Sequence, residues 1–291
     1  MPRNLALIRM AAALLVVGVS SAAFGQDQAK KTAQPTSGRI QKRTYDFKDA
    51  GKEMEYALFV PSSYAKEKKT PLMIALHGLG SNPQQIMRYR GLTDQAEKYG
   101  YIFAAPYGYN SGGWYGAKGP KAGFKFQKKE SKTDDKTAKG KDEKKEEKIP
   151  ENLGELSEKD VMNVLDIVRK EFTIDERRIY LMGHSMGGGG TIHLALKYPD
   201  IWAGLAPIAP AIFRPATDAA KIKHIPIILI QGDQDKLVPV AGPRRWAEQM
   251  KMLEMKYEYL EIAGGGHVDV ALQNIPKIFE FFNKHQKPPK E

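Results

Sequence analysis

Short, uninterrupted apolar runs recur along the chain and predict strands that are buried on both faces of a sheet. Residues 45–60 are typical of further strands that end at Pro61, and a last strand is expected where polar and apolar residues alternate, at residues 257–262. The buried runs fall at residues 71–77, 101–106, 179–182, 202–208 and 225–230.

Segments with helical spacing separate these strands. In residues 159–172, Val161, Val164 and Val168 fall on one face of an amphipathic helix, and Ser157 is the expected N-cap. Further helices are expected at residues 83–99, 191–196, 243–255 and 270–283. Strands that alternate with amphipathic helices predict an α/β fold with a doubly wound, mostly parallel sheet.

The amino-terminal segment has the pattern of a secretory signal peptide. Arg3 and Arg9 give a positive start, residues 10–19 are apolar, and small residues at Ala23 and Gly25 occupy the positions that a signal peptidase reads. The alternative is a retained membrane anchor, although the apolar run is short for a span of about 20 residues. The chain is therefore expected to be secreted or periplasmic.

This interpretation sets the expected domain boundaries. A signal peptide at residues 1–25 is followed by a flexible leader at residues 26–42. A single α/β domain is then expected at residues 43–286. The chain has 291 residues, of which 42% are hydrophobic, and this is enough for a sizeable core.

A lysine-rich insertion at residues 117–152 interrupts the rhythm of strands and helices. Residues 118–148 hold 12 lysines and 7 acidic residues, so this tract carries much of the net charge of +11. Few apolar residues predict a disordered insertion. Because the basic character is local, it does not indicate a nucleic-acid-binding protein.

The chain contains no cysteine, which excludes disulfides, a cysteine nucleophile and thiolate metal sites. No spacing of histidines and carboxylates suggests a metal site, and no cofactor is expected. The sequence does not predict an oligomeric state.

A nucleophile motif stands between a predicted strand and a helix. Residues 183–187, Gly-His-Ser-Met-Gly, fit the pattern G-x-S-x-G. A serine on such a strand-to-helix turn is exposed above the sheet, and glycines at its flanks permit close approach of the two elements. Ser185 is therefore the candidate nucleophile, and the Met186 N–H is a candidate donor to an oxyanion.

A serine hydroxyl becomes a good nucleophile only when a base takes its proton. The chain has six histidines, and their positions relative to the predicted strands favour His267 as this base. His267 directly follows the last strand in a glycine-rich loop, where it can reach over the serine. Of the two aspartates after the strand at 225–230, the spacing favours Asp235 over Asp233 as the group that orients the base, and Asp269 is too close to His267 in sequence. The order serine, aspartate, histidine fits this assignment.

The loop at residues 77–80, His-Gly-Leu-Gly, follows the first buried strand and is expected to supply a second oxyanion donor, the N–H of Leu79. A plain glycine turn is the alternative interpretation of this loop. Trp114 and Tyr115, just before the insertion, are either an aromatic wall for substrate or ordinary packing.

These motifs resemble those of secreted α/β-hydrolase esterases of the polyhydroxybutyrate depolymerase and feruloyl esterase group. The resemblance covers residues 45–282 and rests on the motifs PLMIALHGLGSN, APYGY, KDV, IDERRIYLMGHSMGG, GDQDKLVP and GGGH. It implies an α/β-hydrolase fold and cleavage of carboxylic esters through a serine acyl-enzyme, without a metal, by Ser185, Asp235 and His267. The lysine-rich insertion and the absence of cysteines depart from the group.

Only a short connection, residues 209–223, is available where many lipases place a large cap. The expected cleft is therefore open and suited to small-molecule or polymer-linked esters. A serine peptidase similar to prolyl oligopeptidase has the same triad order and is the nearest alternative. A third hypothesis is a binding protein whose lysine tract contacts anionic envelope polymers.

Overall fold

The computed structural model describes residues 37–119 and 149–289. By its contacts the chain divides after Gln34, and all of the described residues belong to the second unit. The predicted signal peptide, most of the predicted leader and the lysine-rich residues 120–148 lie outside the described residues. Within the described part, no helix is both long enough and apolar enough to cross a membrane.

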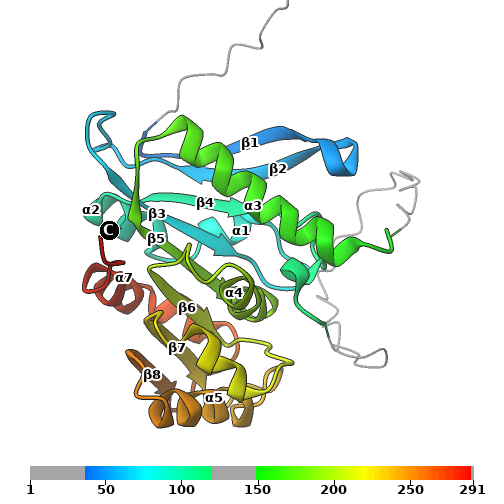
Figure 1. Ribbon diagram of the computed structural model, residues 1–291, viewed down its shortest axis with the longest axis vertical. Helices are drawn as coiled ribbons and strands as arrows, with labels where there is room; N and C mark the ends of the chain where they lie inside the picture. The colour runs from blue at the N-terminus through cyan, green and yellow to red at the C-terminus, as the bar shows by residue number, and fades with distance from the viewer. Residues whose placement is uncertain (1–36, 120–148, 290–291) are drawn as a thin grey trace, which may run out of the picture. The chain divides into compact units, whose positions relative to one another are not determined.

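One eight-stranded sheet forms the centre of the described unit, in the order β1-β2-β4-β3-β5-β6-β7-β8 (Figure 1). All neighbouring strands from β4 to β8 run parallel, whereas β2 is antiparallel to both β1 and β4. The strands are β1 (Ile40–Phe47), β2 (Lys52–Phe59), β3 (Thr70–Leu76), β4 (Ile102–Pro106), β5 (Ile174–His184), β6 (Gly204–Ile208), β7 (Ile227–Gly232) and β8 (Tyr257–Ile262). This confirms the predicted doubly wound, mostly parallel sheet.

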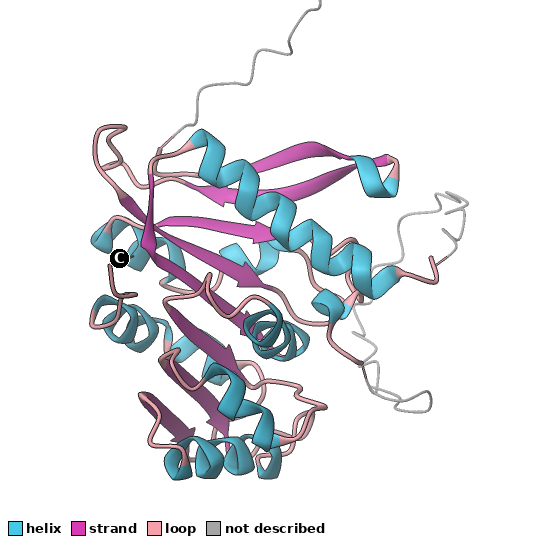
Figure 2. Cartoon of the chain, in the orientation of Figure 1, coloured by secondary structure: helices cyan, strands magenta, loops and turns pink. Residues whose placement is uncertain are grey.

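Helices cover both faces of the sheet (Figure 2). Side chains of α3, α4 and α5 pack in one core cluster, and those of α1, α2, α6 and α7 pack in the other. The α-helices are α1 (Pro83–Met87), α2 (Leu92–Tyr99), α3 (Leu153–Glu171), α4 (Met186–Lys197), α5 (Ala241–Met252), α6 (Asp269–Gln273) and α7 (Ile275–Asn283). Short 3-10 helices are η1 (Lys48–Ala50), η2 (Trp114–Gly116) and η3 (Ala216–Ile222).

The central strand β3 explains why its sequence is apolar throughout. Leu72, Ile74 and Leu76 belong to one core cluster, whereas Met73 and Ala75 belong to the other, as the alternation of side chains along a strand requires. Every residue of β3 is buried. A strand covered by helices on both faces can carry polar side chains only at its ends.

Several element boundaries differ from the prediction. The predicted helix at residues 83–99 is two helices, because Gly91 has a left-handed backbone (φ 81°) between α1 and α2. The predicted closing helix is likewise divided at Asn274 into α6 and α7. Strand β1 begins at Ile40, so the last three residues of the predicted leader pair with β2.

The start of α3 was predicted too late. The helix begins at Leu153, directly after the predicted insertion, and Ser157 is buried in the helix instead of capping it. The Ser157 Oγ accepts a hydrogen bond from the Tyr115 N–H at 2.9 Å. Ser157 therefore ties α3 to η2.

The connection between β6 and β7 is short, as predicted, and holds only η3 as regular structure. No cap domain lies between these two strands. The predicted catalytic and oxyanion residues follow β3, β5, β7 and β8, and Trp114 and Tyr115 follow β4. All of these connections leave the carboxyl edge of the parallel strands, where ligands bind in open α/β folds.

Candidate active site

Ser185 lies on a strained turn between β5 and α4. Its backbone has φ 58° and ψ −115°, a conformation that few residues other than glycine adopt. The turn is fixed by two backbone hydrogen bonds, from the Ser185 N–H to the Ile208 carbonyl at 2.9 Å and from the Ala211 N–H to the Ser185 carbonyl at 3.0 Å. Strand β6 and the loop that follows it therefore stabilise the strained conformation of Ser185.

Glycines at the flanks of the turn are required by space. A Cβ atom at Gly183 would lie 2.2 Å from the Gly187 carbonyl oxygen, and one at Gly187 would lie 2.1 Å from the Leu76 carbonyl oxygen. Any side chain at either position would push α4 away from the sheet. The motif spacing therefore has a steric cause here.

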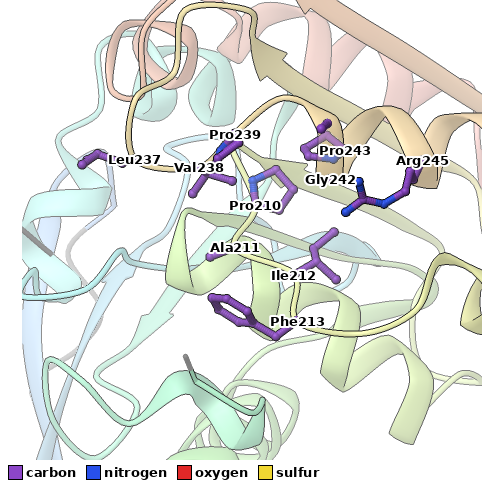
Figure 3. Close-up of a pocket in the computed structure, with 11 residues that line it drawn as sticks. Pro210, Ala211, Ile212, Phe213, Leu237, Val238, Pro239, Gly242, Pro243 and Arg245 are labelled. Atoms are coloured by element: carbon purple, nitrogen blue, oxygen red, sulfur yellow. The ribbon is translucent and has the colours of Figure 1, made fainter. Parts of the chain in front are cut away.

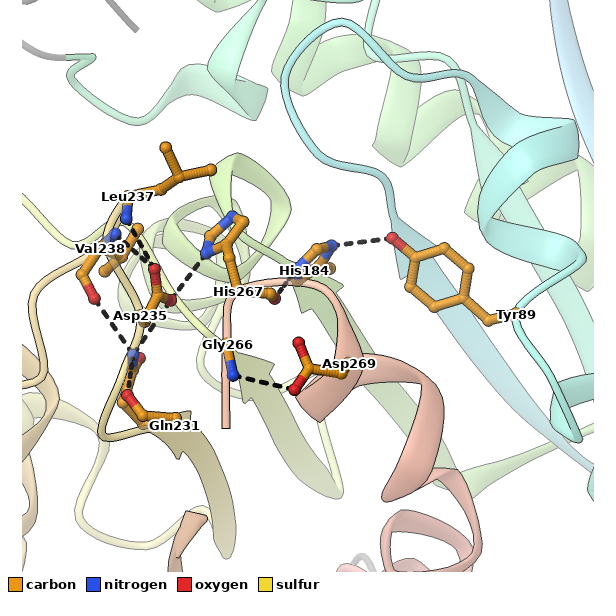
Figure 4. A network of polar contacts seen from close by, with 10 residues as sticks. Tyr89, His184, Gln231, Asp235, Leu237, Val238, Gly266, His267 and Asp269 are labelled. Carbon is orange, nitrogen blue, oxygen red and sulfur yellow. Dashed lines mark hydrogen bonds and ion pairs between the residues drawn. The ribbon is translucent and has the colours of Figure 1, made fainter. Parts of the chain in front are cut away.

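His267 and Asp235 are in direct contact (Figure 4). The His267 Nδ1 lies 2.7 Å from the Asp235 Oδ2, and the Asp235 side chain is fully buried. The other carboxylate oxygen, Oδ1, accepts hydrogen bonds from the N–H groups of Leu237 and Val238, each at 2.8 Å. Gln231 Nε2 adds a bond to Oδ2 at 3.1 Å.

The competing aspartates have other partners. The Asp233 Oδ1 accepts the Gly264 N–H at 2.8 Å, and the Asp269 Oδ2 accepts the Gly266 N–H at 2.9 Å. Both carboxylates thus shape the glycine-rich loop that carries His267. Asp235 is the carboxylate that contacts the His267 ring.

The surroundings keep Asp235 ionised. Burial alone would raise the pKa of its carboxyl group, but the His267 ring and the N–H groups of Val238 and Leu237 outweigh burial and hold that pKa below its usual value. A charged Asp235 accepts a proton-bearing Nδ1 of His267. The Nε2 of His267 then carries the lone pair, and it has no hydrogen-bond partner among the described residues.

Ser185 and His267 lie on adjoining loops. No hydrogen bond joins the Ser185 hydroxyl to the His267 ring in the part of the chain that the structure describes. The residue before the serine, His184, has its ring centroid 4.9 Å from that of His267. Catalytic hydrogen bonds are often long in the absence of substrate, so the geometry remains compatible with a nucleophile and its base.

His184 holds the loop of His267, a function that the sequence did not indicate. Its Nε2 lies 2.8 Å from the His267 carbonyl oxygen, and its Nδ1 lies 2.8 Å from the Tyr89 hydroxyl. Burial, with the charge of His267 second, lowers the pKa of His184 to about 4, so its ring is neutral at pH 7. A neutral ring can donate through Nε2 and accept from Tyr89 through Nδ1.

The loop after β3 passes close to the serine. A Cβ atom at Gly78 would lie 3.5 Å from the Ser185 Cβ. The N–H of Leu79 makes no hydrogen bond within the described residues, and Met186 is the first residue of α4, where N–H groups have no partner inside the helix. Neither predicted oxyanion donor is thus engaged by another hydrogen bond among the described residues.

Of the two interpretations of Tyr115, an aromatic wall of the cleft or ordinary packing, the structure supports packing. Its side chain is fully buried, and its hydroxyl donates to the His77 carbonyl at 3.2 Å. Tyr115 therefore packs beneath the loop of Leu79. Trp114 is half-buried, and its ring makes an edge contact with Phe213, at 5.6 Å between centroids.

A pocket of about 260 Å³ lies next to these loops (Figure 3). One wall follows β6 and the other follows β7 and continues into α5. The sequence did not indicate Phe213, which is 45% exposed at this pocket, because no motif marks it. The lining residues are Pro210, Ala211, Ile212, Phe213, Leu237, Val238, Pro239, Ala241, Gly242, Pro243 and Arg245.

No group of three or more histidine, cysteine or carboxylate side chains in the described ranges is arranged to hold a metal ion.

The chain is similar to known esterases and cutinases. A protein family described as "Putative esterase" matches residues 48–271. The chain is 26% identical to "Putative esterase NocK" of Nocardia uniformis subsp. tsuyamanensis over 197 residues, which are 66% of this chain and 48% of that protein. It is 34% identical to cutinase 2 of Thermobifida cellulosilytica over 94 residues, which are 32% of this chain and 34% of that protein.

Solved structures give the fold. A thermostable esterase superposes with a TM-score of 0.61 at 22% identity, over 85% of this chain and 63% of that one. The feruloyl esterase module from Clostridium thermocellum superposes with a TM-score of 0.60 at 16% identity, over 89% and 93%. The fold is that of the α/β-hydrolases. The chain spans about half the length of the first curated relative and about a third of the second.

Proposed function

Because this chain belongs to the esterase family, we propose that it is a serine hydrolase that cleaves carboxylic esters through an acyl-enzyme. The observation that carries the proposal is the 2.7 Å contact between His267 and the buried Asp235, on loops adjoining the strained Ser185. A buried carboxylate on Nδ1 of a histidine next to a strained serine has a clear chemical use, the activation of that serine.

In the proposed reaction, the Ser185 Oγ attacks the carbonyl carbon of the ester and the His267 Nε2 takes the hydroxyl proton. Asp235 keeps the second proton of the ring on Nδ1 and stabilises the imidazolium that forms. The N–H groups of Leu79 and Met186 donate to the oxyanion of the tetrahedral intermediate. His267 then gives its proton to the departing alcohol, and the acyl group remains on Ser185.

Hydrolysis of the acyl-enzyme repeats these steps with water as the nucleophile. His267 takes a proton from the water as the water oxygen attacks the acyl carbon. It then gives this proton to the Ser185 oxygen as the bond between that oxygen and the acyl carbon breaks, which releases the acid and restores the hydroxyl. The pocket of Figure 3 is lined by residues that bond the site residues: Ala211 contacts the Ser185 carbonyl, and Leu237 and Val238 contact Asp235. We propose that this pocket receives one part of the substrate.

We favour an esterase over the two alternatives that the sequence left open, a serine peptidase and a binding protein. The relatives described above are named esterases or cutinases, and no feature of the described residues favours a peptidase. A binding protein with a vestigial site would have no need of a buried, hydrogen-bonded Asp235. Small-molecule or polymer-linked esters remain the proposed substrates.

Turnover of p-nitrophenyl acetate by purified protein tests the proposal. The wild type should hydrolyse it, and Ser185→Ala, with an unchanged circular dichroism spectrum, should fall to the background rate. Retained turnover in the folded variant would exclude Ser185 as the nucleophile. Faster cleavage of prolyl peptide substrates than of any ester would favour the peptidase instead.

We also propose that the protein is exported, on the basis of the signal-peptide pattern in residues 1–25. The first residue of the mature protein, read by amino-terminal sequencing after expression in a bacterial host, should be Gln26. A protein that retains Met1 and stays in the cytoplasm would contradict export.

A further inference from the structure

The pocket of Figure 3 is apolar except for one residue, Arg245. Ten of the eleven described residues that line it carry no ionisable group. The guanidinium of Arg245 extends from α5 toward Pro210 and Ile212 in Figure 3. Arg245 is exposed to solvent and makes no ion pair and no hydrogen bond with any described residue, so its guanidinium is free to bind an anionic group at the pocket.

The neighbouring arginine behaves differently. Arg244 forms a bidentate ion pair with Glu261, in which Nε donates to Oε2 at 2.9 Å and NH2 donates to Oε1 at 2.5 Å. Arg244 does not line the pocket. Adjacent residues of α5 thus carry the same charge, but only the charge of Arg245 is directed to the pocket.

The pocket is continuous with the catalytic loops. Its first wall contains Ala211, whose N–H donates to the Ser185 carbonyl, and Pro210, which lies against Gly188 of α4. Its second wall contains Leu237 and Val238, whose N–H groups bind Asp235. The pocket therefore adjoins the loops that carry Ser185 and Asp235.

We infer that this pocket selects esters that carry a carboxylate, with an apolar body against Pro210, Ile212 and Phe213 and the carboxylate paired with Arg245. The inference rests on the proposed esterase function and names its substrate class. Guanidinium groups suit carboxylates because two parallel N–H groups match two oxygens. The volume of about 260 Å³ admits a body the size of one aromatic ring, and the Phe213 and Trp114 rings offer an aromatic edge.

The carboxylate can belong to either half of the ester, and two substrate pairs distinguish these sources. On the alcohol side, 4-carboxyphenyl acetate is compared with its neutral methyl ester. On the acyl side, the monomethyl ester of benzene-1,4-dicarboxylic acid is compared with the dimethyl ester. In each pair the measured quantity is the ratio of kcat/KM for the charged substrate to kcat/KM for the neutral one.

The variants are Arg245→Gln, Arg245→Glu and the matched control Arg244→Gln. In the pair whose carboxylate reaches the pocket, Arg245→Gln should lower the ratio about fivefold, the effect of a partly exposed ion pair. Arg245→Glu should lower the ratio further, because it places a like charge in the pocket. Arg244→Gln removes the same formal charge from α5 and should leave the ratio unchanged.

Equal ratios for wild type and Arg245→Gln in both substrate pairs would overturn the inference while leaving the proposed esterase in place. An equal fall in Arg244→Gln would also overturn it, because it would indicate the net charge of α5 instead of the pocket. If no ester is hydrolysed at all, the proposed function fails separately. Binding of benzoate to Ser185→Ala, measured by NMR titration, then decides: weaker binding on adding Arg245→Gln supports the pocket, and unchanged binding contradicts it.

Discussion

Single residues hold His267 from two directions. Asp235 contacts its ring at Nδ1, and His184 contacts its backbone carbonyl. The ring is thus oriented by a charged group and the loop by a neutral one. This division allows the carboxylate to set the tautomer while the loop stays in place.

We predict that Asp235→Asn lowers kcat for p-nitrophenyl acetate by about a thousandfold or more, because an amide favours the wrong tautomer of His267. Asp233→Asn is the matched control: it keeps an oxygen for the Gly264 N–H and should retain most of the activity. Steady-state kinetics on both variants measure the effect. Comparable losses in the two variants would contradict the assignment of Asp235.

The buried His184 makes stability depend on pH. Its pKa in the folded protein is about 4, below the usual value of 6.5, so the unfolded chain binds the proton more readily. The stability associated with a neutral His184 is present above pH 6.5 and is lost as the pH falls through about 4. Between pH 7 and pH 5 this single group should cost about 2 kcal/mol.

Urea unfolding at pH 7 and pH 5 tests this prediction. His184→Gln keeps an N–H donor for the His267 carbonyl but does not titrate, so its loss of stability on acidification should be smaller than that of the wild type. His224→Gln, at an exposed histidine, serves as control and should follow the wild type. The same loss in all three proteins would rule out this contribution of His184.

The residues of the site were predictable to different degrees. Ser185, His267 and Asp235 stand in short motifs, because a turn, a glycine loop and a strand end each leave a local pattern. The partners of His184 were not predictable, since Tyr89 and His267 approach it only through the fold. Tyr115 was ambiguous because an aromatic residue before an insertion can face either the core or the cleft.

Elements were predicted well in their interiors and less well at their ends. Strand β3 is recognisable because both of its faces are buried, whereas the first turn of α3 follows a polar segment. Leu153 and Leu156 are the apolar residues of that turn, too few for a periodic pattern. The division between α1 and α2 depends on one left-handed glycine, Gly91.

The approach of α4 to β3 gives a prediction at this scale. Gly187→Ala would place a methyl group 2.1 Å from the Leu76 carbonyl, so we expect a loss of stability of about 3 kcal/mol from the forced displacement. Gly242→Ala in α5 meets nothing within 4 Å and should be neutral or slightly stabilising. Urea unfolding of both variants would contradict the steric account if Gly187→Ala is as stable as Gly242→Ala.

For the molecule as a whole, the sheet brings together residues that are far apart in the sequence. The serine, the carboxylate and the histidine follow β5, β7 and β8, and all leave the same edge. The sequence predicted the class of sheet, mostly parallel and doubly wound, but not the order of its strands. The apolar pattern indicates which strands are buried on both faces, but it does not show which strands are neighbours. The pocket of Arg245 needs two loops and a helix, so no stretch of sequence revealed it.

The central claim is that Ser185 is a nucleophile activated by His267. The most direct measurement is labelling of the purified protein with a fluorophosphonate probe, followed by mass spectrometry of its peptides. The account predicts one modified peptide, which contains Ser185, and labelling that is strongly slowed in His267→Ala. A well-folded wild type that stays unlabelled, or that is labelled at another residue, would contradict the account.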